Sequence, residues 1–233
     1  MSFEKTVRRA FVELDTARIH YRHAGADSEH LPVVLVHASP GSSLGLVPLI
    51  RALSQDRRVI APATVVNGDS VAEIPDGADI GWFADHLAGA LDALGLERVD
   101  LYGTHTGASL ATELALRQPE RVRAVVLDGV GLYPPELQQE LLQRYAPALQ
   151  LDHQGSYLIW IWHFVGDMFM FWPWYRLDAA HRRAIGLPAP EVLHEKVVEV
   201  LKAARTYHHP YRAAIAYDKR AKIPQLRMPT LAA

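Results

Sequence analysis

The stretch Tyr102–Ser109, YGTHTGAS, decides how this chain folds. It lies between an apolar run, RVDL, and a helical pattern, LATELALRQ. Gly103 and Gly107 flank His105 at positions −2 and +2, which is the spacing of a nucleophile elbow, a strained turn between a strand and a helix. The centre of such a turn normally holds Ser, Cys or Asp, so the sequence raises the question of what an imidazole does there.

Apolar runs alternate with helical patterns on both sides of this turn. Continuous apolar runs predict strands, and apolar residues at helical spacing predict the helices between them. We expect strands at 33–36, 57–62, 98–103 and 122–130, helices at 46–53, 78–94 and 107–118, and a hairpin from 11–14 and 18–25. Strands that are apolar throughout and alternate with helices indicate an α/β fold, with a mostly parallel sheet covered by helices on both faces.

Three polar residues stand where predicted strands end. His37 and His105 each follow an apolar strand, and Asp128 closes another. Ligands of open α/β sheets bind at the carboxyl ends of the strands. We therefore expect the functional site to contain these positions.

The strand signal stops at about Tyr133 and returns only near residue 224. The region between reads as helices, at 134–149, 157–174 and 190–217. We predict three segments: an α/β core at 1–132, a helical cap at 133–220 and a return to the core at 221–233.

Four segments, in order, make the chain resemble the α/β-hydrolase superfamily, specifically its members with a helical cap. VVLVHASPGSS at 33–43 is similar to the strand and oxyanion loop, and RVIAPATVVNGDS at 58–70 is similar to the next strand and turn. The segment 99–130 resembles the elbow, its helix and the following strand. IPQLRMPTL at 223–231 resembles the strand that leads to the loop of the catalytic acid. The resemblance implies the α/β-hydrolase fold and hydrolase activity.

The chain departs from the family pattern in three ways. His105 occupies the nucleophile position, Ala38 follows His37 where Gly is usual, and Ala63 stands where Asp is common. The family pattern also continues past the end of this sequence, so we expect a truncated chain in which the last strands are missing. The open sheet edge beside 122–130 then predicts a homodimer formed through that edge.

An imidazole at the elbow has three chemical roles open to it: general base, covalent nucleophile or metal ligand. The sequence has no helical two-histidine motif, so neither a metal nor another cofactor is predicted. An acting His105 needs an orienting carboxylate, and Asp128 ends the neighbouring strand at a spacing of roughly 5 Å. The alternatives are that His105 only fills the turn and that Asp128 caps the loop around Gly129.

The resemblance also implies an oxyanion hole. Its donors are the backbone N–H groups of Thr106 and Ser39, and His37 braces the loop that carries Ser39. Thr106 opens a helix, whose N-terminal end favours an anion. An equally good interpretation is that Ser39 only stabilises the turn before Pro40. Ser109 falls on the helix and is expected to point away from the turn.

Most of the five tryptophans lie in the predicted cap. A cap roofs the cleft, so some of these side chains are expected to line a pocket for a small, mostly apolar molecule. The candidates are Trp160, Trp162, His163, Trp172 and Trp174. The alternative is that they form only the core of the cap. The run 157–174 is apolar enough to consider a membrane span, but Asp167 near its middle favours a buried or cleft-lining helix.

Composition narrows the function further. The net charge of −2 gives no reason to expect nucleic acid or an anionic membrane as a partner. Because the chain has no cysteine, disulfides, thiolate metal sites and a Cys nucleophile are excluded. The N-terminus, MSFEKTVRRAF, lacks the apolar core of a signal peptide, so a cytoplasmic location is expected.

These observations predict a hydrolase of small, apolar, ester-type substrates in which His105 acts as base or nucleophile. Two alternatives stay open at this stage. The first alternative is a catalytically inactive binder of a small apolar ligand. The second is a proton-transfer enzyme that is not a hydrolase. The second alternative needs only a base and an oxyanion hole.

Overall fold

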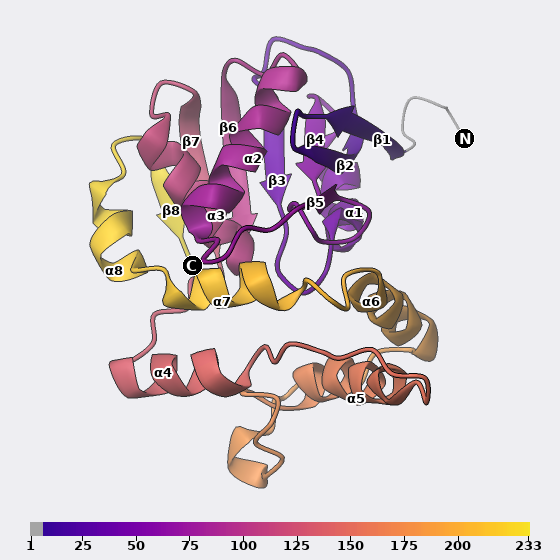
Figure 1. The fold of residues 1–233 in the computed structure, drawn as a ribbon. Coiled ribbons are helices and arrows are strands. Elements are labelled where there is room, and N and C mark those ends of the chain that lie inside the picture. The colour runs from indigo at the N-terminus through magenta and orange to yellow at the C-terminus, as the bar shows by residue number, and fades with distance from the viewer. Residues whose placement is uncertain (1–6) are drawn as a thin grey trace.

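A computed structural model describes residues 7–233 (Figure 1). Within these residues eight strands form one sheet in the order β1-β2-β4-β3-β6-β7-β8, and β5 pairs with β2. The strands are β1 (Arg8–Glu13), β2 (Ala17–Ala24), β3 (Val33–Val36), β4 (Val59–Pro62), β5 (Val71–Ala72), β6 (Val99–Thr104), β7 (Val122–Asp128) and β8 (Thr230–Ala232). The predictions made on residues 1–6, which are part of the expected core segment and of the N-terminal stretch, lie outside the described residues.

The helices fall into two groups, three before β7 and five after it. The first group, within residues 7–233, is α1 (Val47–Leu53), α2 (Ile80–Ala93) and α3 (Thr106–Arg117). The second is α4 (Pro135–Arg144), α5 (Ser156–Met170), α6 (Pro190–Lys202), α7 (His208–Ala216) and α8 (Lys219–Lys222). Most helices and strands expected from the apolar pattern are present, with bounds shifted by a few residues. The segment 190–217 is an exception, because it forms two helices, α6 and α7, and the strand expected from about residue 224 begins only at Thr230.

The direction of the strands follows the sequence expectation. β1 and β2 form the predicted antiparallel hairpin, and β2 is also antiparallel to β4. From β4 onward every neighbour is parallel: β3 pairs with β4 and β6, β6 with β7, and β7 with β8. The prediction of an α/β fold with a mostly parallel sheet is confirmed.

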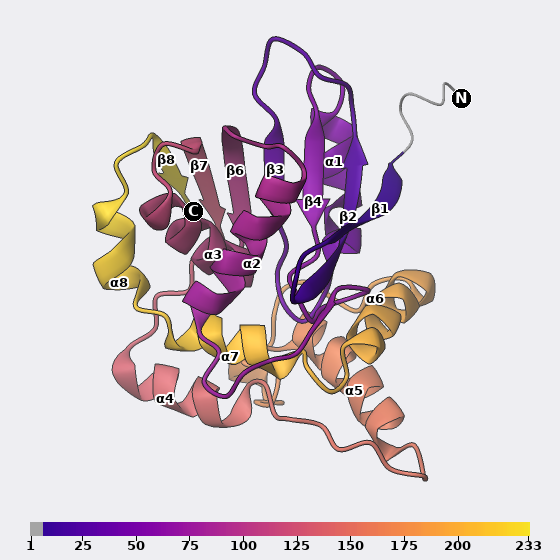
Figure 2. The same ribbon diagram turned by 45° about the horizontal axis from the view of Figure 1, so that its top comes forward.

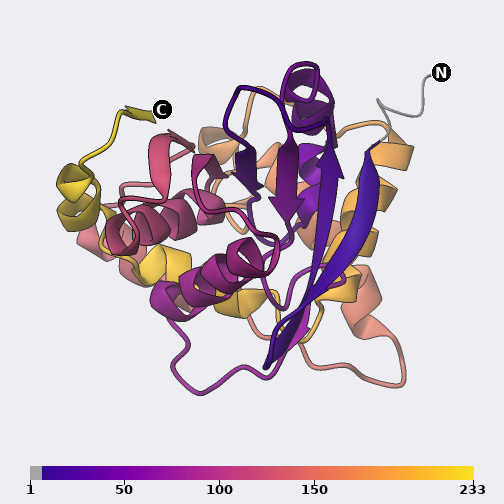
Figure 3. The same cartoon turned by 90° about the horizontal axis from the view of Figure 1, so that it is seen from above.

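Strand β3 is buried on both faces, which explains why its sequence is apolar throughout. Side chains alternate across a strand. Val34 and Val36 therefore join the apolar cluster made with α2 and α3, whereas Leu35 joins the cluster made with α1. From above, α2 and α3 lie on one side of the sheet and α1 lies on the other (Figure 3). The face shared with α1 is less covered toward β7 and β8, where Val126 and Leu231 are exposed.

The chain between β7 and β8 forms a helical layer, residues 133–220, below the carboxyl ends of the strands (Figure 1). Helices α5 and α6 lie side by side (Figure 2) and share an apolar cluster that includes Phe164 and Val197. Helix α7 instead packs on α2 and α3, and its Ala214 belongs to the core of the sheet. The layer therefore has a core of its own and one helix that anchors it to the sheet.

Buried charges join this layer to the core. Glu199 on α6 is only 4% exposed and accepts a hydrogen bond from the Ser42 hydroxyl in the loop after β3. Lys202 Nζ lies 2.9 Å from Glu199 Oε1 and 3.1 Å from Asp69 Oδ2, in the loop after β4. The carboxylate of Glu199 is thus buried with both a hydroxyl and an ammonium partner, as a buried charge requires.

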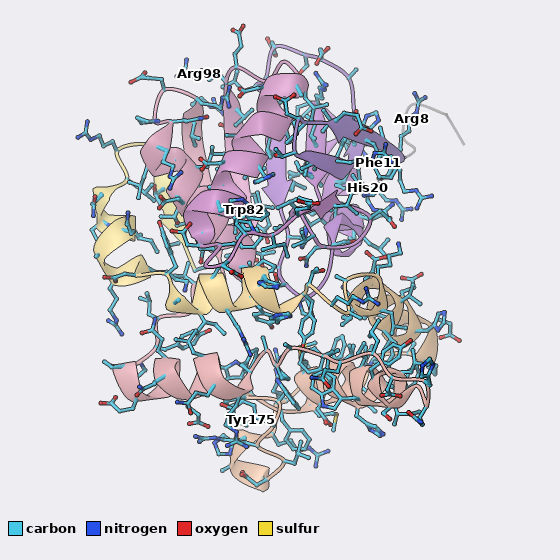
Figure 4. The ribbon with its side chains drawn as sticks, viewed as in Figure 1. Arg8, Phe11, His20, Trp82, Arg98 and Tyr175 are labelled. Carbon is cyan, nitrogen blue, oxygen red and sulfur yellow. The ribbon has the colours of Figure 1, made fainter. Side chains whose placement is uncertain are left out.

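Polar contacts also hold the layer together internally. Tyr175, labelled in Figure 4, follows α5 and donates its hydroxyl to Glu140 Oε1 of α4 at 3.0 Å. The Arg176 guanidinium contacts the same carboxylate and lowers its pKa. Helix α4 is thereby fixed to the segment between α5 and α6.

The apolar run 157–174 forms most of α5 and ends in the segment that follows it. Among residues 7–233, no helix has both the length and the apolar character that crossing a membrane demands. Helix α5 buries Ile161, Phe164 and Val165 against α6 and its neighbours, in agreement with the prediction of a buried helix.

The sequence placed the open sheet edge at β7, and this was wrong. Strand β8 pairs in parallel with β7, with Thr230 opposite Val125, so β8 is the edge strand of the described sheet. All three residues of β8 are exposed, and Leu231 is 64% exposed. A homodimer through this edge stays a prediction.

Two glycines allow α3 to begin directly against the sheet. A Cβ on Gly107 would lie 2.2 Å from the carbonyl oxygen of Val36 in β3. A Cβ on Gly103 would lie 2.2 Å from the carbonyl oxygen of Gly107. Both obstacles are backbone atoms, which have no rotamer to move out of the way, so only glycine fits at either position.

We predict that Gly107→Ala lowers the free energy of unfolding by about 3 kcal/mol, because helix and strand must move apart to admit the methyl group. Urea denaturation measures this. Gly186→Ala is the matched control: its Cβ would meet no atom within 4 Å, so a change within about 0.5 kcal/mol is expected. Equal destabilisation by both variants would contradict the close backbone contact.

Candidate functional site

A cavity of about 490 Å³ lies where the helical layer faces the carboxyl ends of β3, β6 and β7. Its wall on the sheet side contains Ser39, His105, Thr106 and Gly129, which follow these three strands. The wall on the helical side contains Tyr133, Leu141, Tyr145, Met168, Trp172, Arg183, Tyr211, Ile215 and Lys219. The cavity thus brings together residues more than a hundred positions apart in the sequence.

His105 stands on a strained turn at the entrance to α3. Its backbone has φ 51° and ψ −106°, and its N–H donates to the Asp128 carbonyl at 2.8 Å. Positive φ is costly for a residue with a side chain, on the order of 1–3 kcal/mol. A Cβ on Gly129 would lie 1.9 Å from His105 Nδ1, so the imidazole rests on the backbone just after β7. The turn lifts an exposed imidazole into the cavity.

Asp128 does not orient this imidazole. Its carboxylate accepts a hydrogen bond of 2.6 Å from the Tyr102 hydroxyl. Asp128 pairs with Thr104 in the sheet, so its side chain projects on the same face as Tyr102. Burial, followed by the neighbouring carboxylate, raises the pKa of Tyr102 to about 12. Within residues 7–233 no side chain makes a hydrogen bond to the His105 ring, so the predicted pairing of His105 with Asp128 is not formed.

The two residues predicted as oxyanion donors both line the cavity. Thr106 is the first residue of α3 and is 3% exposed. The first backbone N–H groups of a helix have no partner inside the helix, so that of Thr106 is available to an anion. Ser39 is 6% exposed, and its hydroxyl has no hydrogen-bond partner within the described part of the chain. The cavity therefore offers unused donors beside His105.

His37 braces the loop that carries Ser39, which is the role expected for it. Its Nδ1 contacts the Ala38 carbonyl at 2.9 Å, and its Nε2 accepts a hydrogen bond from the Thr64 N–H at 2.8 Å. This pairing requires a neutral ring with the proton on Nδ1. Full burial lowers the pKa of His37 to about 4. His37 is thus a structural link between the loops after β3 and β4.

Of the five aromatic-segment residues proposed as pocket lining, only Trp172 lines the cavity. Trp160 stacks on Phe164 and meets Trp174 edge-on, so Trp160 and Trp174 belong to the core of the helical layer. Trp160 and Phe164 are four residues apart, which places them on the same side of α5. Trp162 and His163 point to solvent. Of the five candidates, two therefore pack in the core of the layer, two are exposed and one lines the cavity.

The sequence did not single out the cations and phenols of the cavity. Arg183 and Lys219 line it together with Tyr133, Tyr145 and Tyr211, and among residues 7–233 no Asp or Glu belongs to its wall. Burial raises the pKa of Tyr133 and of Tyr211, and raises that of Tyr145 to about 12, so all three phenols stay protonated. Arg183 lies in a stretch without periodicity, and Lys219 lies in a charged run, DKRAK, that is typical of a surface. The cavity is therefore positive at neutral pH.

Metal binding finds little support in the described residues. Within 7–233, no three His, Asp or Glu side chains gather into a group that could hold a metal ion. The ring centroids of His208 and His209 lie 4.1 Å apart with the rings tilted by 35°, and neither residue lines the cavity. The groups at the site are an imidazole, backbone donors, phenols and two cations.

Comparison with known proteins places residues 32–158 in a family described as alpha/beta hydrolase fold. The chain is 47% identical over 104 residues to a 2-hydroxy-6-oxo-2,4-heptadienoate hydrolase of Pseudomonas putida, covering 42% of this chain and 37% of that protein. It is 38% identical over 127 residues to a 2-hydroxymuconate semialdehyde hydrolase of Pseudomonas putida, covering 52% of this chain and 44% of that protein. The chain thus spans about two fifths of the length of these relatives.

Solved structures show the same fold over nearly the whole chain. An epoxide hydrolase of Mycobacterium thermoresistibile superposes on 97% of this chain and 82% of its own, with a TM-score of 0.68 and 21% identity. A mutant of potato epoxide hydrolase superposes on 97% of this chain and 81% of its own, with a TM-score of 0.72 and 16% identity. At these identities the likeness concerns the fold alone.

We predict that acidification destabilises the protein partly through His37. The folded ring takes a proton only near pH 4, whereas an unfolded His does so near pH 6.5. The unfolded state therefore gains the proton first, so this stabilisation is complete above about pH 6.5 and is lost as the pH falls toward 4, by about 3 kcal/mol.

Urea denaturation at a series of pH values tests this. His37→Gln, which can still donate and accept, should flatten the fall in unfolding free energy. Burial also lowers the pKa of His208 to about 4, so the double variant with His208→Gln should be flatter still. A single His37→Gln variant with the wild-type slope would show that His37 is not held neutral.

Proposed function

Because the chain belongs to the α/β-hydrolase fold family, we propose that it is a hydrolase of small carbonyl compounds that carry a carboxylate. One observation carries the proposal: a single cavity holds His105 on its strained turn, unused donors beside it and a positive opposite wall. The sequence predicted a small, apolar, ester-type ligand. The proposal retains the small size and the carbonyl group and adds an anionic end to the ligand.

In this proposal His105 acts as a general base toward water, or attacks the carbonyl carbon itself. Imidazole is the commonest general base in proteins. The oxyanion that forms would be stabilised by the backbone N–H groups of Thr106 and Ser39, each such donor typically supplying a factor of about 10²–10³ in rate. Among residues 7–233 no carboxylate orients the His105 ring, so slow turnover is expected, because the ring is not fixed in one tautomer.

Arg183 supports the anionic end of the ligand. Arg183 lines the cavity, and its guanidinium donates to the Met168 carbonyl at 2.8 Å. Burial raises the pKa of neighbouring Tyr145, and the charge of Arg183 opposes that rise. Among residues 7–233, no Asp or Glu of the wall neutralises this charge. Arg is the side chain best suited to bind a carboxylate in two places at once. Leu141, Met168 and Trp172 would hold an apolar body next to this charge. The names of both Pseudomonas relatives describe hydrolases of oxygenated dienoate or semialdehyde compounds, which is consistent with this class.

A second candidate function is the binding of such a ligand without turnover. The observation that favours it is the absence, within residues 7–233, of any hydrogen bond to the His105 ring. Tryptophan fluorescence during ligand titration, with no product formed, would distinguish binding from hydrolysis, because Trp172 lies in the wall.

We predict that His105→Ala lowers the rate of ester hydrolysis by about 100-fold, because His105 is the one general base that the described residues place on the sheet side of the cavity. Release of 4-nitrophenol from a 4-nitrophenyl ester measures the rate. His163→Ala is the control, since His163 is exposed on α5 and does not line the cavity. Equal rates for wild type and His105→Ala would remove His105 from the mechanism.

We predict that Arg183→Met raises KM for 4-nitrophenyl hydrogen succinate by about tenfold, which corresponds to about 1.4 kcal/mol, and leaves KM for the neutral butyrate ester unchanged. Arg182→Met, one residue earlier and outside the cavity wall, is the matched control. Loss of affinity for both esters alike would indicate a change in cavity shape, and would count against carboxylate recognition.

A further inference from the structure

We propose that the Lys219 amine, in the wall of the same cavity, forms reversible imines with small aldehydes and ketones. This is a second reactive group with a chemistry separate from hydrolysis. It does not depend on His105, so the proposed function and this inference can fail independently.

Lys219 is buried in a way that lysine side chains rarely are. It is the first residue of α8 and is 7% exposed, and its side chain lines the cavity together with Ala214 and Ile215. Its Nζ donates to the Ala214 carbonyl oxygen. The carbonyl fixes the position of the nitrogen but supplies no full negative charge.

No carboxylate neutralises this ammonium group within residues 7–233. Lys202 and Lys222 show the usual arrangement, since each lies within 4 Å of a Glu or Asp oxygen. Lys219 makes no such ion pair. The carboxylate next to it in sequence, Asp218, instead caps α8 by accepting a hydrogen bond from the Ala221 N–H at 3.0 Å.

The other titratable groups of the cavity do not supply a negative charge for Lys219 either. His105 and Arg183 are not anions, and the phenols of Tyr133, Tyr145 and Tyr211 stay protonated. Burial without a counter-ion lowers the pKa of Lys219 to about 8. At neutral pH about a tenth of the molecules then carry the free amine, compared with less than about 0.1% for an ordinary lysine. A desolvated lysine of this kind is a nucleophile for carbonyl carbon.

The reaction balances without any oxidant or reductant. The nitrogen lone pair attacks the carbonyl carbon, the C–N bond forms, and one N–H proton passes to the carbonyl oxygen, which gives a neutral carbinolamine. The hydroxyl group takes a second proton from solvent, the C–O bond breaks and water leaves. The remaining N–H proton then returns to solvent, which leaves the C=N bond of the imine. Water reverses the sequence and releases the carbonyl compound. The cavity, at about 490 Å³, has room for a ring-sized aldehyde.

Reductive trapping tests the proposal. The protein is incubated near neutral pH with benzaldehyde and sodium cyanoborohydride, which converts an imine to a stable benzylamine. Peptide mapping by mass spectrometry then gives the rate at each lysine and separates it from the N-terminal amine. We expect Lys219 to be benzylated at least tenfold faster than Lys222, which lies on the same short helix and is paired with Glu113.

Variants identify the cause. Lys219→Met should abolish the fast benzylation, while Lys222→Met and His105→Ala should retain it. If Lys219→Met does not fold, the wild-type map still decides the matter. Labelling of Lys219 no faster than Lys222 would overturn the inference, even if the His105 variant had already established hydrolysis.

Discussion

The site depends on one contact between backbone atoms, where the first turn of α3 rests on the ends of β3 and β6. Gly103 and Gly107 let carbonyl groups approach to within a distance that no Cβ would permit. This approach forces the connection through a positive φ at His105, and that conformation aims the imidazole away from the sheet. The same helix start leaves the Thr106 N–H without an internal partner. A steric constraint therefore provides both the lifted side chain and the donor beside it.

The charge of the cavity follows from the groups on its two walls. The sheet side supplies dipoles and an imidazole, and the helical side supplies apolar surface, phenols and two cations. Within the part of the chain that the structure describes, neither wall contains a carboxylate. A cavity of this kind favours a ligand with negative or developing negative charge, and it disfavours the protonated form of any amine that it buries. The proposals for Arg183 and Lys219 follow from the same charge imbalance.

Much of this fold could be predicted from the sequence because apolar periodicity is a local property. The strands at 33–36 and 122–130 and the turn around His105 were all predictable. The predicted contact between the Asp128 carboxylate and His105 is not formed, although strand alternation was sufficient to place this side chain. Asp128 pairs with Thr104, so its side chain lies on the same face of the sheet as Tyr102 and does not point into the cavity. Arg183 and Lys219 could not have been found, because their role depends on packing between segments about eighty and more than a hundred positions from His105.

The buried carboxylate of Glu199 has a consequence for how ligands reach the cavity. If α6 moved away from the sheet, Glu199 would lose the Ser42 hydroxyl, and Lys202, which lies on the same helix, would lose Asp69. A hydrogen bond to a charged group contributes about 1.5–3 kcal/mol, so both losses oppose the movement. Such an open form would be rare. Trp172 and Arg183 are both exposed while also lining the cavity, so they mark its mouth. Ligands are therefore expected to enter and leave the cavity between these two residues, without a movement of α6.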